Sequence, residues 1–149
     1  MNESGYLIEK DKIIDVITDL FVFTDAKDWN KVKNCFTEKV HFDMSSLGGE
    51  ATVLSSQQIA DAWNQGLAPI QVVHHQTGNF KVEINDNDAT AFCYGTAYHH
   101  LKTKSGNNTR IFVGSYDFHL TKNENKWLID KFKFNLKFID GNLNLGKDV

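Results

Sequence analysis

Apolar side chains in the first third of the chain recur at the spacing of a helix. Over residues 9–25, positions three and four apart are apolar, which predicts one amphipathic helix because such positions share a face. These positions are Ile13, Val16, Ile17, Leu20 and Phe21. Asp28 is a suitable N-cap for a second, short helix. A Ser55-x-x-Gln58 capping box predicts a third helix over residues 56–65, and a short strand is expected before it, over 40–44.

After Pro69 the apolar positions alternate instead, which is typical of strands. Four such segments follow, separated by short turns rich in Asn, Asp and Gly: residues 71–84, 89–103, 110–121 and 126–139. Long consecutive strands with tight turns predict an antiparallel meander that must bend. Glycines inside strands mark bends or close approaches to the backbone, and Gly78, Gly95 and Gly114 are the candidates. Helices segregated from such a sheet define an α+β fold.

The chain's size and composition fit one globular domain without a membrane span. Its 149 residues predict a single domain, with a core over about 9–139 and a frayed tail over 141–149. Hydrophobic residues make up 41% and charged residues 23%, and no apolar run approaches the ~18 residues of a spanning helix. The first residues lack the features of a signal peptide, so we expect a cytoplasmic protein. A net charge of −3 argues against a nucleic-acid partner.

Two adjacent histidine pairs stand on neighbouring predicted strands, His74-His75 and His99-His100. Neighbouring side chains on a strand point to opposite faces, so only one histidine of each pair can face inward. Periodicity alone does not select which one, and a hydrogen-bonded core histidine is as compatible with it as a pocket. A metal site would need three or four convergent donors, and the sequence has no spacing typical of one. Phosphate-loop and dinucleotide motifs are also absent from the sequence, so we expect neither a metal nor a cofactor.

Aromatic side chains make up 12% of the chain and share one parity along three of the strands. Tyr94, Tyr98 and His100 share a parity, as do Phe112 and Tyr116 on the next strand. An ordinary core would explain this pattern, and so would an apolar pocket with a few polar groups, which is the usual composition of a small-molecule site. The residues that we expect to bind a small hydrophobic ligand are Tyr94, Tyr98, Tyr116, Phe112, Trp63 and Met44.

Three stretches, over residues 23–29, 36–43 and 74–79, occur in an order and spacing that resemble a known group. Over about residues 9–139 the chain is similar to the SnoaL-like and scytalone-dehydratase-like branch of the nuclear-transport-factor-2-like superfamily. The resemblance implies a cone, in which a strongly curved antiparallel sheet wraps around three N-terminal helices. It also implies self-association, as a homodimer or a homotrimer.

The same resemblance implies a catalytic aspartate–histidine pair deep in the cone, with Asp25 and His75 at the matching positions and His100 as a second histidine. His75 would abstract a proton next to a carbonyl or a leaving group, and Asp25 would hold its tautomer and stabilise the imidazolium. The implied activity is that of a cofactor-independent lyase, of the dehydratase or dehydrohalogenase type, or of an isomerase.

The helper residues of these enzymes are missing from this chain. The tyrosines that orient a water in scytalone dehydratases correspond to Thr24 and Met44, and their serine and asparagine correspond to Gly114 and Tyr116. The helper lysine of the related dehydrochlorinase is absent from the region of residues 19–21. An altered substrate is one explanation. A non-catalytic ligand-binding cone is an alternative, and the enzyme requires Asp25 and His75 to lie within hydrogen-bond reach and to face the cavity. A partner-binding module is the third possibility, and it would show an exposed apolar patch on the outer sheet face without an internal pocket.

Overall fold

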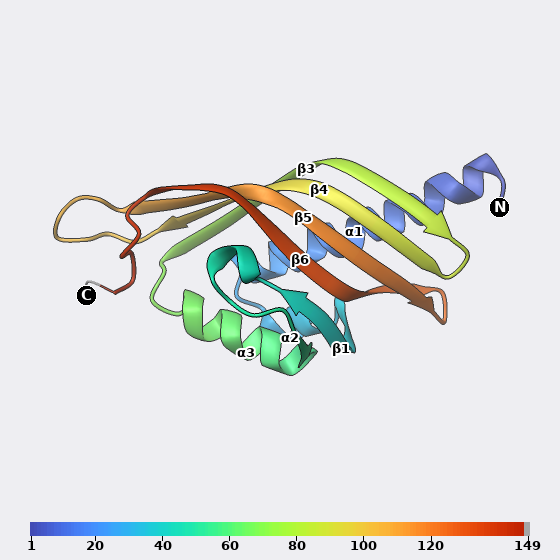
Figure 1. The fold of residues 1–149 in the computed structure, drawn as a ribbon, viewed down its shortest axis with the longest axis horizontal. Coiled ribbons are helices and arrows are strands. Elements are labelled where there is room, and N and C mark those ends of the chain that lie inside the picture. Colours follow the sequence, from blue (N-terminus) through green and yellow to red (C-terminus); the bar gives the residue numbers. More distant parts are fainter. Residues whose placement is uncertain (148–149) are drawn as a thin grey trace.

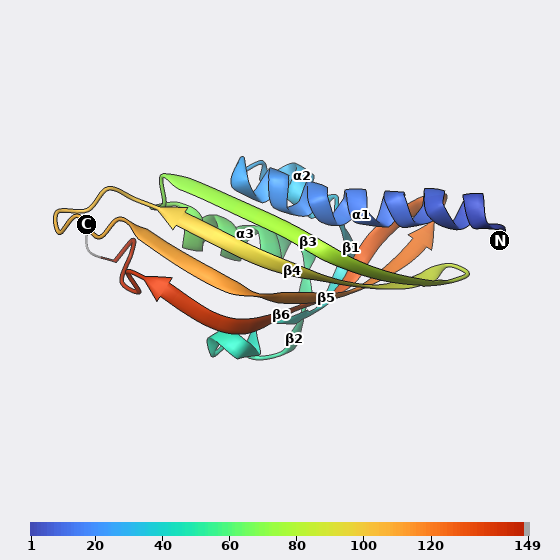
Figure 2. The ribbon, with the colours of Figure 1, turned by 90° about the horizontal axis from the view of Figure 1, so that it is seen from above.

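The computed structural model describes residues 1–147, and it contains three α-helices and a six-stranded sheet. The helices are α1 (Glu3–Asp25), α2 (Trp29–Lys33) and α3 (Ser56–Leu67), and a 3-10 turn, η1, covers Ser45–Leu47. The strands are β1 (Phe36–Asp43), β2 (Thr52–Ser55), β3 (Val72–Asn85), β4 (Asp88–His100), β5 (Thr109–Asn123) and β6 (Lys126–Gly141). Figure 1 shows the long strands arching over α2 and α3, and α1 runs alongside β3 in Figure 2. The predicted α+β cone is confirmed.

The strand order in the sheet is β2-β1-β6-β5-β4-β3. The predicted antiparallel meander accounts for β3 to β6. The sheet as a whole is mixed, because β1 pairs with β6 in parallel and with β2 antiparallel. β2 was not predicted from the sequence, because it has only four residues and none of them is buried.

The two capping signals noted in the sequence predicted the starts of α2 and α3 correctly. The capping box of Ser55 and Gln58 forms as expected, and the Asp28 side chain accepts from the backbone N–H of Lys31. The first helix begins earlier than predicted, at Glu3, with the Asn2 side chain accepting from the backbone N–H of Gly5. Its first turns carry no buried side chain, so the apolar period could not reveal them.

The sheet bends at two register shifts between β5 and β6, one of which lies at Gly114. A Cβ at Gly114 would overlap the carbonyl oxygen of Asn135, and a Cβ at Gly95 would overlap the ring of Tyr116. Both positions therefore need glycine because another group approaches the backbone closely. At Gly95 this approach lets the Tyr116 ring lie across β4.

The hydrophobic core fills the space between the concave face of the sheet and the helices. Its fully buried side chains come from α1, α2, α3 and the strands β1, β4, β5 and β6, and they include Ile13, Ile17, Leu20, Val32, Val40, Ile59, Cys93, Leu120, Trp127, Ile129 and Phe132. Among residues 1–147, no helix combines the length and the apolar character that crossing a membrane requires.

The segment that follows β6 packs against the domain as far as residue 147. Leu145 is buried and forms a small cluster with Ile70 and Val73. Its carbonyl oxygen accepts a hydrogen bond from Nη1 of Arg110 at 3.3 Å. The prediction of a frayed tail is therefore wrong for residues 142–147. This segment has no periodic apolar pattern, and the single buried side chain of Leu145 is what holds it against the domain. Residues 148–149 lie outside the described residues.

Candidate active site

The end of α1 brings Asp25 against His75 of β3. The carboxylate Oδ1 lies 2.6 Å from the His75 Nδ1, and Oδ2 accepts the backbone N–H of the same histidine at 2.8 Å. Both side chains are mostly buried, with 18% of Asp25 and 11% of His75 exposed. Because the carboxylate is attached at two points, the relative position of helix and strand fixes the orientation of the imidazole.

This contact determines which ring nitrogen of His75 is free to react. In the neutral ring, Nδ1 carries the proton and donates to Asp25, so Nε2 keeps its lone pair. Phe21, one turn before Asp25 on α1, stacks on the imidazole with ring centroids 4.9 Å apart and an interplanar angle of 26°. The pair thus has the arrangement of a histidine base oriented by a carboxylate.

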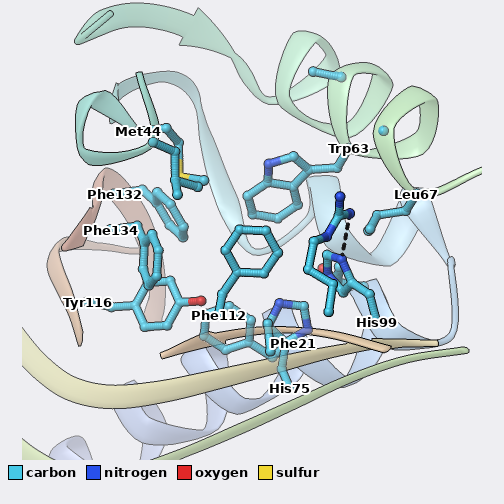
Figure 3. Close-up of a pocket in the computed structure, with 16 residues that line it drawn as sticks. Phe21, Met44, Trp63, Leu67, His75, His99, Phe112, Tyr116, Phe132 and Phe134 are labelled. Atoms are coloured by element: carbon cyan, nitrogen blue, oxygen red, sulfur yellow. Dashed lines mark hydrogen bonds between the residues drawn. The ribbon is translucent and has the colours of Figure 1, made fainter. Parts of the chain in front are cut away.

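His75 lines a cavity of about 250 Å³ on the concave side of the sheet. Figure 3 shows Trp63 and Leu67 on one side of this cavity, with Phe132 and Phe134 on another. The hydroxyl of Tyr116 points toward the middle of the labelled side chains in Figure 3. Burial raises the pKa of this hydroxyl, so the phenol stays protonated and can donate a hydrogen bond. The polar lining residues are Thr24, His75, His99, Arg110 and Tyr116.

Five of the nine side chains predicted to form the site line this cavity. His75 is one of them, and the four expected ligand contacts are Met44, Trp63, Phe112 and Tyr116. Their roles toward a ligand remain predictions.

Three other predicted site residues lie on the opposite, convex face of the sheet. Tyr94 is 44% exposed and Tyr98 is 38% exposed, and His100 is also exposed. The even-numbered side chains of β4 were expected to face the cavity, but the odd-numbered ones do so. Its inward side chains are small and leave room for the rings of Phe112 and Tyr116, whereas its outward aromatic side chains pack on their own neighbours; the Lys137 ammonium, for example, lies 4.0 Å from the Tyr94 ring centroid. The inward residues of this strand are Cys93, Gly95, Ala97 and His99.

His99, and not His100, is the second histidine of the cavity. It is 8% exposed, and its Nδ1 accepts a hydrogen bond from Nη2 of Arg110 at 3.0 Å, the contact dashed in Figure 3. Burial and then the nearby Arg110 charge lower the pKa of His99 from 6.5 to about 4. His99 is therefore neutral at pH 7, with its proton on Nε2.

The lowered pKa of His99 predicts a loss of stability in mild acid. In the unfolded chain His99 binds a proton below pH 6.5, whereas in the folded chain it does so only near pH 4. The neutral His99 ring therefore contributes its full share to the free energy of unfolding above pH 6.5, and this share is lost as the pH falls toward 4. Between pH 7 and pH 5 we expect this group to lower the free energy of unfolding by about 2 kcal/mol. Urea unfolding at the two pH values measures it.

The His99→Gln variant should lose most of this pH dependence. The His100→Gln variant, which changes the exposed neighbour, should keep it. Equal pH dependence in wild type and His99→Gln would show that His99 titrates normally in the folded protein.

Arg110 was not predicted as a site residue from the sequence, and His99 was not selected from its pair. A usable signal for Arg110 existed, because it is the only arginine among the 16 lysine and arginine residues of the chain. Among residues 1–147 there is no group of three or more His, Cys, Asp or Glu side chains arranged to hold a metal ion.

A curved sheet around three helices, with a carboxylate–imidazole pair at an apolar cavity, defines this domain as a nuclear-transport-factor-2-like cone. The sequence profile of the SnoaL-like domain matches residues 6–133. The chain therefore belongs to the SnoaL-like family, which confirms the resemblance noted in the sequence. No curated protein matches the sequence.

Several solved structures share the fold at low sequence identity. A protein from Kribbella flavida superposes with a TM-score of 0.88 at 18% identity, over 95% of this chain and 99% of that one. A candidate scytalone dehydratase from Novosphingobium aromaticivorans gives 0.82 at 12% identity, over 95% and 92% of the two chains. A hexachlorocyclohexane dehydrochlorinase from Novosphingobium barchaimii gives 0.80 at 13% identity, over 97% of each chain. At these identities the likeness concerns the fold.

Proposed function

We propose that this protein is a cofactor-independent lyase or isomerase that removes a proton from carbon in a small hydrophobic substrate. The observation that carries the proposal is the 2.6 Å contact between Asp25 and His75 Nδ1 at the wall of the cavity. This contact leaves the Nε2 lone pair as a base. A histidine base is useful near neutral pH, and its positioning is typically worth 10²–10⁴-fold in rate.

In the proposed reaction, Nε2 of His75 takes a proton from a carbon next to a carbonyl or a leaving group. The electron pair of the broken C–H bond forms a new carbon–carbon double bond. In a lyase the leaving group departs with its own bonding pair, and in an isomerase the carbonyl oxygen receives the charge and another carbon is reprotonated. The Asp25 carboxylate stabilises the imidazolium that forms in either case.

The substrate class follows from the cavity lining, which is mainly aromatic and aliphatic. A cavity of about 250 Å³ lined by Phe112, Phe132, Phe134 and Trp63 fits a compact ring system better than a polar metabolite. Two proteins of the same fold are described as a dehydrochlorinase and a candidate scytalone dehydratase, which favours the lyase type. The second candidate, a ligand-binding cone without catalysis, would use the same cavity.

Hydrogen–deuterium exchange tests the proposal without knowledge of the natural substrate. A panel of cyclic and aromatic ketones is incubated with the protein in D₂O, and proton loss at the carbon next to the carbonyl is followed by NMR. The expected result is exchange above the buffer rate for at least one ketone that binds. Binding of several panel members, detected by quenching of tryptophan fluorescence, without any exchange would overturn the catalytic proposal and support the binding cone.

We also propose that the protein associates with itself, as a homodimer or a homotrimer, through the convex face of the sheet. Tyr94, Tyr98 and Phe138 on this face are 44%, 38% and 54% exposed, and exposed apolar groups of this kind are typical of interaction surfaces. Sedimentation velocity should show a dimer or trimer for the wild type, and Tyr98→Lys should shift it toward monomer. A wild type that is monomeric at micromolar concentration would refute this prediction.

A further inference from the structure

Arg110 places a positive charge at the wall of a mainly apolar cavity. It lies at the start of β5, directly opposite His99 on β4, and its side chain is one of the cavity-lining groups. The guanidinium carbon lies 5.2 Å from the ring centroid of Phe112. The fifteen other basic side chains of the chain are lysines, so the only planar, permanently charged donor is at this position.

Protein groups within residues 1–147 do not neutralise this charge. No carboxylate of the described residues lies within 4.0 Å of the guanidinium. Its two recorded acceptors are uncharged: the His99 Nδ1 at 3.0 Å and the Leu145 carbonyl at 3.3 Å. The third nitrogen, Nε, is buried without an acceptor among the described residues. Arg110 as a whole is half-buried, and a charge that is partly removed from water is normally stabilised by a nearby anion, which the described residues do not supply.

The neighbours of Arg110 accept hydrogen bonds from its guanidinium without neutralising its positive charge. The low pKa of His99, about 4, keeps that ring neutral at pH 7, so it accepts from Arg110 without repelling it. Because Nδ1 accepts, the proton of His99 is on Nε2, which makes this ring a second donor. His75 stands on the adjacent strand β3, where it pairs with Ala97, two residues from His99 on the same face of β4.

We infer that Arg110 and His99 form the subsite for an anionic oxygen of the ligand, and that the cavity takes a flat, apolar molecule that carries a carboxylate or an enolate or phenolate oxygen. The apolar part of the ligand lies against the aromatic lining, and its charged oxygen takes the place of the missing anion beside Arg110. This inference deepens the proposed function and rests on it for one step. In the proposed reaction, a substrate carbonyl oxygen placed beside Arg110 gains this negative charge as His75 removes the proton and the enolate forms, and the guanidinium stabilises it.

Binding of matched acid and amide probes tests the inference without any catalysis. The first two probes are 2-naphthoate and naphthalene-2-carboxamide, which have nearly the same shape and differ in charge. The third probe is 2-naphthol, measured at pH values below and above its ionisation, so that its neutral and phenolate forms can be compared. We expect the wild type to bind 2-naphthoate about tenfold or more tighter than the amide at pH 7, the size of effect that a hydrogen bond to a charged group supplies. Tighter binding of naphthol after ionisation would identify a phenolate or enolate oxygen as an acceptable source of the charge.

Two variants separate Arg110 from general electrostatics. Arg110→Gln should abolish the preference for 2-naphthoate over the amide. The affinity for the amide should stay within about twofold of wild type, because the amide carries no charge for Arg110 to pair with. Lys104→Gln removes the same charge from the exposed turn between β4 and β5, and it should preserve the preference. Thermal unfolding of each variant checks that it is folded.

A third measurement does not require a folded Arg110 variant. Because the chain has a single arginine, an arginine-directed dicarbonyl reagent such as phenylglyoxal has one guanidinium to modify, and peptide mass spectrometry measures the adduct at that residue. We expect 2-naphthoate to protect the wild type and the amide at equal occupancy to protect less. Equal affinity of wild type for acid and amide, or equal protection by both, would overturn the inference. The acid preference should persist in His75→Gln, so failure of the catalytic proposal leaves this test intact.

Discussion

Replacing His75 by glutamine should reduce enzyme-dependent proton exchange by about 10²–10⁴-fold, the range typical for loss of a positioned general base. Glutamine is similar in size and polar, but its amide has no basic nitrogen. The ring of His75 contacts Phe21 and Asp25 near the cavity wall, and 11% of its side chain is exposed, so the substitution changes little of the hydrophobic core. Exchange into the best ketone of the panel, measured by NMR at saturating ketone, gives the rate.

Asp25→Asn should have a comparable effect although it leaves the base in place. The amide NH₂ group can donate to Nδ1 of His75 where the carboxylate accepted, and this favours the tautomer whose Nε2 carries the proton and has no lone pair for the substrate. In the serine-protease triad the corresponding change lowers kcat about 10⁴-fold, and the cause is the same tautomer reversal. The ¹⁵N shifts of the His75 ring report the tautomer directly. They should show a protonated Nδ1 in the wild type and a protonated Nε2 in Asp25→Asn.

His74 supplies the matched control for these two variants. It precedes His75 on β3 and faces the convex side of the sheet, where its ring centroid is 6.1 Å from that of Tyr98. His74→Gln should therefore exchange protons at the wild-type rate. If His75→Gln and His74→Gln were equally active, or if Asp25→Asn changed neither the tautomer nor the rate, the pair would have no catalytic role.

The sequence predicted the elements of this fold where one face of an element is buried and the other is not. The helix containing Ile13 and Ile17 has such a face, and the meander strands alternate. The same reasoning failed on β4 because both of its faces carry a side-chain pattern that looks internal. Its outward positions are aromatic, including Tyr94 and Tyr98, and its inward positions are small, including Gly95 and Ala97. Alternation determines that two faces exist, but the rings that β5 contributes determine which face of β4 is the inner one.

The candidate site was predictable only in part for a related reason. Periodicity left the choice between His74 and His75 open, and the family resemblance selected His75, which the structure places at the cavity with Asp25. The resemblance also selected His100, which lies outside. Arg110 is in contact with His99 across the strand pair and with Leu145, 35 residues later. Contacts of this kind depend on strand register and on the path of the final segment, and neither is encoded in a local pattern.

Truncating Phe132 to alanine should lower the free energy of unfolding by about 3–5 kcal/mol. The Phe132 ring is 2% exposed and stands where the core meets the cavity. It stacks on Phe42 with centroids 5.2 Å apart, and it meets Trp63 edge-on at 5.5 Å and Tyr116 at 5.6 Å. The loss therefore combines the removed apolar surface with an empty volume that rings from β1, α3 and β5 cannot all move to fill. Urea unfolding at pH 7 measures the difference.

Phe138 is the control for this effect because it is the same residue type on the same strand, and it is 54% exposed on the convex face. Phe138→Ala should cost less than about 1 kcal/mol, since little of its surface leaves water on folding of one chain. Similar losses in the two variants would mean that Phe132 is not a central core residue.

Phe132 also lines the cavity, so its removal enlarges the ligand space at a point distant in sequence from Asp25 and His75. A folded Phe132→Ala protein should therefore bind larger ring systems than the wild type. Its His75 ring should still carry the proton on Nδ1. The two results together would distinguish residues that shape the cavity from residues proposed to carry out the chemistry.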